Sequence, residues 1–81
     1  MNNKTRTKIL STIYHFSNEC GYVNGEHLLM AFNRKKMTKA FDNTIMRFVR
    51  RLTESGVVKR INRGEYKMTA KGRTSILKKL S

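Results

Sequence analysis

The chain of 81 residues has no proline and only one cysteine. A single cysteine cannot form an intramolecular disulfide, so the composition fits a reducing compartment, and we expect a cytoplasmic location. No apolar run approaches the roughly 18–20 residues that a membrane span needs. Residues 1–8 are polar and no apolar signal region follows them, so neither membrane insertion nor secretion is expected.

Acidic residues are also scarce. Five Asp and Glu stand against 18 Lys and Arg, which gives a formal net charge of +13. Self-repulsion of this size destabilises a compact monomer unless a polyanion or a partner offsets it. The charge therefore predicts a nucleic acid as the partner, ahead of an anionic membrane. The length predicts one domain over residues 1–81.

Signatures of catalysis and of metal binding are missing as well. The acidic residues form no recognisable pair, and neither a glycine-rich phosphate loop nor a nucleophile–base arrangement can be assigned. His15, Cys20 and His27 are the soft metal-ligand candidates, and their spacing matches no zinc pattern. We expect Cys20 to be a small buried apolar residue. The sequence predicts no enzyme, no cofactor, no metal and no evident small-molecule ligand.

The first half of the chain contains helical spacings. Residues 1–4 are predicted to be a flexible basic arm. Apolar residues from Ile9 to Phe16 then indicate a helix that ends before Gly21. Asn24 is expected to cap a second helix through its side-chain oxygen.

A strongly amphipathic third helix is predicted over residues 38–55, with Thr38 as its N-cap and Gly56 as its stop. Its apolar residues recur at i, i+4, i+7, i+8 and i+11, and at about 100° per residue they share one face. These residues are Phe41, Ile45, Phe48, Val49 and Leu52.

A β-hairpin is predicted over residues 57–69. Residues 57–61 are rich in β-branched side chains, and residues 62–65 contain a glycine and fit a loop of about three to five residues. A last helix over residues 70–80 follows, although Gly72 near its start is unfavourable in a helix. The expected fold is mainly α with a small β-hairpin, in the order α-α-α-β-β-α.

This order resembles the winged helix-turn-helix family of DNA-binding transcription regulators over nearly the whole chain. The resemblance is carried by the predicted third helix and by two motifs, Glu54-Ser55-Gly56-Val57-Val58 and Tyr66-Lys67-Met68-Thr69-Ala70-Lys71-Gly72. The second motif is similar to the Tyr-x-Leu-Thr-x-x-Gly that ends many such wings, with methionine in place of leucine. The resemblance implies a recognition helix at residues 38–55, a wing at 57–69 and a closing helix at 70–80.

The predicted third helix is basic on the face opposite its apolar residues. We place Lys39, Asn43, Met46, Arg47 and Arg50 on that face. In the winged helix fold it meets the major groove, where Asn can pair with adenine and Arg with guanine. The candidates for base contacts are Lys39, Asn43 and Arg47. The alternative is a solvated basic face without a ligand.

Phosphate contacts are expected before the third helix, near its end and around the hairpin turn. The candidates are Lys35, Lys36, Thr38, Arg50, Lys59, Arg60, Arg63 and Lys67. The alternative for the hairpin residues is that they only block aggregation through the strand edges.

Together these features predict a small transcriptional regulator that binds double-stranded DNA sequence-specifically and acts by occupying its site. It would be nucleoid-associated, or lie in the host cytoplasm if the protein is viral. Three alternatives stay open: an architectural DNA binder with little sequence preference, a winged-helix protein-interaction module and an RNA binder. The chain lacks the paired aromatics typical of single-strand recognition, which disfavours the last of these.

A homodimer on two half-sites is also expected, because one helix reads only a few base pairs. The last predicted helix is the candidate contact, through Ile76, Leu77 and Leu80. The alternative is that all three side chains pack inside the monomer.

Overall fold

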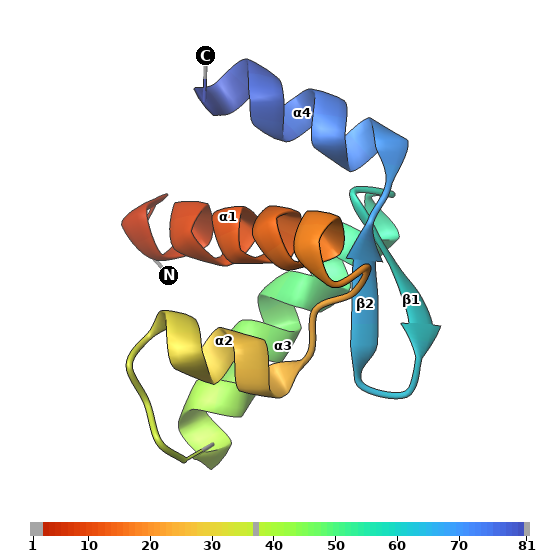
Figure 1. Ribbon diagram of the computed structural model, residues 1–81. Coiled ribbons are helices and arrows are strands. Elements are labelled where there is room, and N and C mark those ends of the chain that lie inside the picture. The colour runs from red at the N-terminus through yellow and green to blue at the C-terminus, as the bar shows by residue number, and fades with distance from the viewer. Residues whose placement is uncertain (1–2, 37, 81) are drawn as a thin grey trace.

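The computed structural model describes the backbone of residues 3–36 and 38–80 and the side chains of residues 3–36 and 38–78. Its elements follow one another in the predicted order α-α-α-β-β-α. They are the helices α1 (Asn3–Glu19), α2 (Gly25–Ala31), α3 (Lys39–Glu54) and α4 (Ala70–Leu80) and the strands β1 (Val58–Asn62) and β2 (Glu65–Met68). Figure 1 shows α1 between α4 on one side and α2 and α3 on the other, with the antiparallel hairpin near one end of α1.

The first helix, α1, is longer than predicted at its start. It begins at Asn3, so the expected flexible arm is wrong for Asn3 and Lys4, and residues 1–2 lie outside the described residues. The helix ends before Gly21, whose φ of 85° is a backbone conformation that glycine adopts readily. Its buried side chains recur every three or four residues and so form one face: Ile9, Thr12, Ile13 and Ser17.

The second helix, α2, begins with a capping box. Asn24 Oδ1 accepts a hydrogen bond from the His27 backbone N–H at 3.0 Å, and His27 Nδ1 accepts one from the Asn24 N–H at 3.2 Å. The predicted cap at Asn24 is confirmed. The sequence did not indicate the histidine, because Glu or Gln usually completes this motif. The His27 ring also stacks on Phe16 of α1, with centroids 3.9 Å apart, so it joins the two helices.

The third helix, α3, has the boundaries that the sequence predicts. The Thr38 hydroxyl accepts a hydrogen bond from the Phe41 N–H at 3.2 Å, which confirms the N-cap. At the other end Gly56 has a φ of 82°, and the Val57 N–H donates to the Leu52 carbonyl at 2.9 Å. This is the 6→1 bond of a Schellman motif, so Gly56 ends α3 as expected.

The hairpin has a tighter turn than predicted. Only Arg63 and Gly64 lie between β1 and β2, and a register irregularity before the turn accommodates the remaining length. Val23, which precedes α2, adds a short antiparallel bridge to the hairpin through Tyr66. The N–H of each residue donates to the carbonyl of the other, at 2.7 and 2.9 Å. The hairpin is therefore fixed to the segment between α1 and α2.

One hydrophobic core joins all these elements. Burial of apolar surface is the main favourable contribution to folding, so the contacts of this core position the outer faces of the helices. Its buried members are Ile9, Ile13, Val23, Leu28, Ile45, Val49, Leu52, Val58, Met68 and Ile76. Ile45, Val49 and Leu52 are thus confirmed as the core side of α3, and Phe41 and Phe48 pack at its edges.

The start of α4 approaches the chain just after α3 very closely. The Thr69 hydroxyl lies 3.0 Å from the Val57 carbonyl and accepts a hydrogen bond from the Gly72 N–H at 3.0 Å. A Cβ atom added at Gly72 would lie 2.1 Å from the Val57 carbonyl oxygen. Glycine is unfavourable for the helix by itself, but this close approach requires it.

The orientation of α4 corrects one part of the dimer expectation. Ile76 is only 3% exposed and belongs to the core, so its assignment to a dimer contact is wrong. Leu77 is 53% exposed, and the side chain of Leu80 lies outside the described part. Within the described ranges, no helix is long and apolar enough to cross a membrane.

Candidate nucleic-acid interface

The outer face of α3 presents the three residues predicted to contact bases and one residue predicted to contact phosphate. Because the core side of the helix is buried, residues about half a turn away point to solvent. These are Lys39, Asn43, Arg47 and Arg50, and all four are exposed. Among the described side chains of residues 3–36 and 38–78, they make no hydrogen bond or ion pair. Their donors, and the Asn43 carbonyl acceptor, are therefore available to an external ligand.

Met46 does not belong to this face, so its predicted position is wrong. It lies about 100° around the helix from Ile45, which places it at the boundary between the two faces. There it packs against the core and lines a cleft with Asp42 of α3 and with Gly64 and Tyr66 of the hairpin. The hairpin turn therefore lies beside one flank of α3.

The segment before α3 adds exposed cations. Lys35 and Lys36 are exposed, and Arg34 lies over the Phe41 ring with 4.5 Å between the guanidinium carbon and the ring centroid. The Thr38 oxygen caps α3, and its hydroxyl hydrogen remains able to donate to a phosphate.

The hairpin places two lysines directly opposite each other. Lys59 pairs with Lys67 in the ladder, one position from the buried pair Val58 and Met68, so the two lysines lie on the face away from the core. Like charges across a strand pair are destabilising, and a bound anion would offset that repulsion.

The arginines near the turn differ in how free they are. Arg63 in the turn is exposed and has no partner among the described residues. The Arg60 Nε–H donates to the Asn62 carbonyl at 3.3 Å, so part of this guanidinium supports the turn. Its other donors remain free for a phosphate.

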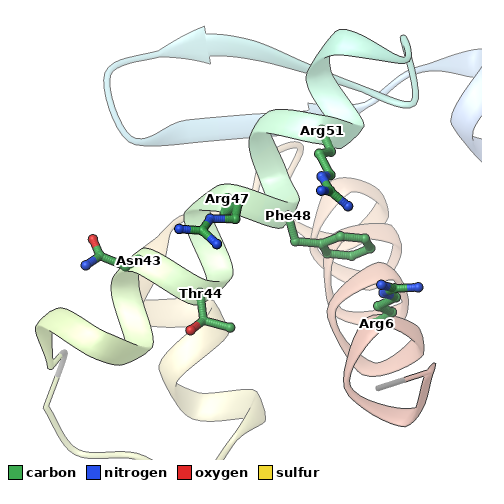
Figure 2. A pocket seen from close by; sticks show the side chains of 6 residues that line it. All are labelled: Arg6, Asn43, Thr44, Arg47, Phe48 and Arg51. Carbon is green, nitrogen blue, oxygen red and sulfur yellow. The ribbon is translucent and has the colours of Figure 1, made fainter. Parts of the chain in front are cut away.

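A groove of about 400 Å³ lies between the start of α1 and the other flank of α3 (Figure 2). Six residues line it: Arg6, Asn43, Thr44, Arg47, Phe48 and Arg51. Sequence reasoning placed neither Arg6 nor Arg51 among the contact residues. Arg51 follows Arg47 by one helical turn, a spacing that could have revealed it. Arg6 lies near this site only because the fold brings α1 beside α3, and no local pattern indicates that.

The remaining ligand candidates lie elsewhere. Cys20 is exposed in the turn after α1, so the expectation of a buried cysteine is wrong. Among the described residues, no three His, Cys, Asp or Glu side chains are placed to hold a metal ion.

The hairpin turn and the groove beside α1 thus lie on opposite flanks of α3, and exposed cations occur in all three places. Comparison with known proteins gives no match: no family model, no curated protein and no solved structure is significantly similar to this chain.

Proposed function

We propose that this protein is a winged helix-turn-helix DNA-binding protein that acts as a small transcriptional regulator. In this proposal α3 is the recognition helix and the hairpin is the wing. The observation that carries it is the exposed face of α3, where the side chains of Lys39, Asn43 and Arg47 make no hydrogen bond or ion pair with other described residues. The hairpin turn, with the exposed Arg63, lies beside the same helix.

The dimensions and chemistry of α3 fit this role. An α-helix with its side chains is about 10–12 Å across, and the major groove of B-DNA is about 12 Å wide. Arginine can bind guanine O6 and N7 with two hydrogen bonds, and asparagine can bind adenine N6 and N7 in the same way. Arg47 and Asn43 lie one turn apart on α3, so they can reach neighbouring base pairs. The protein bound at its DNA site would regulate transcription by blocking or recruiting polymerase.

The proposal is tested by comparing duplex DNA, single-stranded DNA and RNA of one length at two salt concentrations. Duplex DNA is expected to bind most tightly, and selection from a random duplex pool is expected to yield a consensus. Tight duplex binding without a consensus would favour an architectural role. Tighter binding to RNA would contradict the proposal.

Base contacts and phosphate contacts are separable by substitution. Arg47→Ala and Asn43→Ala are each expected to cost about 1–3 kcal/mol on the selected site and to relax preference at particular base pairs. Arg63→Ala, the matched control, is expected to weaken specific and random duplexes to a similar degree. Titration of the three variants against both duplexes measures this. Equal losses on both duplexes for Arg47→Ala would make Arg47 a phosphate contact.

We also propose that two copies bind adjacent half-sites through α4. Leu77 is 53% exposed on that helix, and Figure 1 shows α1 between α4 and α3, so such a contact leaves both α3 faces free. Lys71 and Arg73 on both copies repel each other, so the dimer is expected to be weak without DNA.

Sedimentation equilibrium with a duplex whose half-site centres are about 10 base pairs apart measures the assembly. Wild type is expected to bind as two copies and Leu77→Asp as one. Met30→Asp is the control, because Met30 is 66% exposed on α2 and receives the same charge. One-to-one binding by wild type, without a repeated half-site, would rule the dimer out.

A further inference from the structure

We propose that the groove between α1 and α3 is a phosphate-binding site in which Arg6 and Arg51 hold a phosphate of the DNA backbone. This makes α1 part of the DNA interface. Only the source of the phosphate rests on the function proposed above. The cationic groove itself is a feature of the fold.

The arrangement of the side chains supports an anion site. Figure 2 shows Arg51 and Arg6 on either side of the Phe48 ring in this view, with Arg47 beside Asn43 at the opposite rim. Phe48 is half-buried at the edge of the core, so the groove has an apolar wall and a cationic rim. Arg6 and Arg51 are both exposed, and their side chains make no hydrogen bond or ion pair within the described residues.

The charge of the groove favours a phosphate. Three of its six lining residues are arginines and none is acidic, so their mutual repulsion is offset when an anion enters. The planar guanidinium presents paired N–H donors that match two phosphate oxygens, an arrangement that lysine cannot reproduce. A space of about 400 Å³ corresponds to roughly a dozen water molecules, so a backbone phosphate can enter with part of its hydration.

The position of the groove favours backbone phosphate over a free nucleotide. The hairpin turn lies beside the α3 flank that carries Asp42 and Met46, whereas the groove lies on the flank that carries Arg47 and Arg51. A helix in the major groove has a phosphate backbone on each side. The hairpin can therefore meet one strand while the α1–α3 groove meets the other.

The test compares Arg6→Ala and Arg51→Ala with Lys4→Ala. Lys4 lies on α1 about 200° around the helix from Arg6, so this control removes the same charge outside the groove. Fluorescence anisotropy with duplex DNA over a range of salt concentrations gives affinity and salt dependence. Each groove variant is expected to bind about tenfold more weakly and to lower the slope of log K against log[salt] by about 1. Lys4→Ala is expected to leave the slope unchanged.

Two further measurements test how the groove holds a phosphate and which source of phosphate fills it. Arg6→Lys keeps the charge but not the paired donors, so it is expected to retain the slope and lose affinity. NMR titration with inorganic phosphate and with a nucleoside triphosphate follows the Nε–H signals of the groove arginines. Weak shifts at millimolar concentrations are expected, because only one phosphate subsite is filled.

The outcomes separate this inference from the proposed function. If wild type binds duplex DNA and the groove variants behave like Lys4→Ala, the groove is not a phosphate contact and DNA binding stands. If wild type binds no duplex but the nucleotide binds tightly and Arg6→Ala abolishes that binding, the groove stands and DNA binding falls. If neither ligand binds, both proposals are overturned.

Discussion

The affinity of this protein for duplex DNA is expected to fall by about 10³- to 10⁴-fold when monovalent salt rises from about 50 to about 200 mM. Each phosphate that a cationic side chain neutralises releases condensed counterions, and added salt opposes that release. Contacts to roughly six to eight phosphates give a slope of log K against log[salt] of about −5 to −7.

The structure indicates why the slope is smaller than the net charge of +13 would suggest. Cations on the α3 face, on the hairpin and in the α1–α3 groove are the ones expected to contribute. Two cations of α4 have partners inside the protein: Lys71 Nζ donates to the Ser55 carbonyl at 3.0 Å, and Arg73 bonds to Asn18. A bound phosphate would have to compete with these internal hydrogen bonds, so we expect these two cations to contribute little.

Anisotropy titrations at four or more salt concentrations measure the slope directly. Arg63→Ala, which removes one exposed cation from the hairpin turn, is expected to reduce the magnitude of the slope by about 1. The same protein on single-stranded DNA should show a shallower dependence, because single strands condense fewer counterions per phosphate. A slope near zero, or no duplex binding at the lowest salt, would contradict DNA binding by this protein.

Local signals predicted the elements that depend on local chemistry. Thr38 and Gly56 bracket α3 in the sequence, and in the structure both ends of the helix depend on their hydrogen bonds or backbone conformation. Asn24 starts α2 for the same reason. The apolar spacing of α3 also predicted its buried side, and so the exposure of Asn43 and Arg47.

Residues at the boundary of a face were harder to assign from sequence. Met46 lies about 100° from the centre of the buried side of α3, where helical periodicity alone does not decide between core and solvent. Contacts with the hairpin decide its position. Ile76 and Leu77 pose the same problem on α4, because adjacent apolar residues point about 100° apart and only the packing of the helix buries one of them.

Contacts between distant segments were not predictable from one sequence. The bridge between Val23 and Tyr66 joins residues more than forty positions apart, and so does the groove shared by Arg6 and Arg51. No periodicity or capping signal relates such pairs. The sequence therefore predicted which side chains of α3 are exposed, but not that the start of α1 lies beside them.

The close approach of Gly72 to the Val57 carbonyl leads to a second large expected effect, on the stability of the protein. Gly72→Ala is expected to lower the free energy of unfolding by about 2–4 kcal/mol, because the new methyl group would overlap the Val57 carbonyl. The Cβ–oxygen distance would be 2.1 Å, and the oxygen belongs to the backbone just before β1, so it cannot turn aside like a side chain. A domain of this size is stable by roughly 4–12 kcal/mol, so the loss is a large fraction of the total.

Helix propensity alone predicts that Gly72→Ala raises the free energy of unfolding, so the sign of the measured change distinguishes the two effects. Alanine is about 1 kcal/mol better than glycine inside a helix, and Gly72 lies in the first turn of α4. Gly21→Ala is the control, since its added Cβ meets no atom within 4 Å and only the φ of 85° opposes it. That strain is expected to cost about 1–2 kcal/mol.

Urea denaturation of wild type and both variants gives the three free energies. If Gly72→Ala is as stable as wild type, then α4 does not approach the Val57 carbonyl closely enough to exclude a methyl group. If it is destabilised as expected, the effect should extend to binding: α4 can relieve the overlap only by moving away from Val57, and the hairpin then loses its support beside α3. Gly72→Ala should therefore lose affinity for duplex DNA at urea concentrations well below the midpoint of its unfolding transition. Folded Gly21→Ala should bind duplex DNA like wild type.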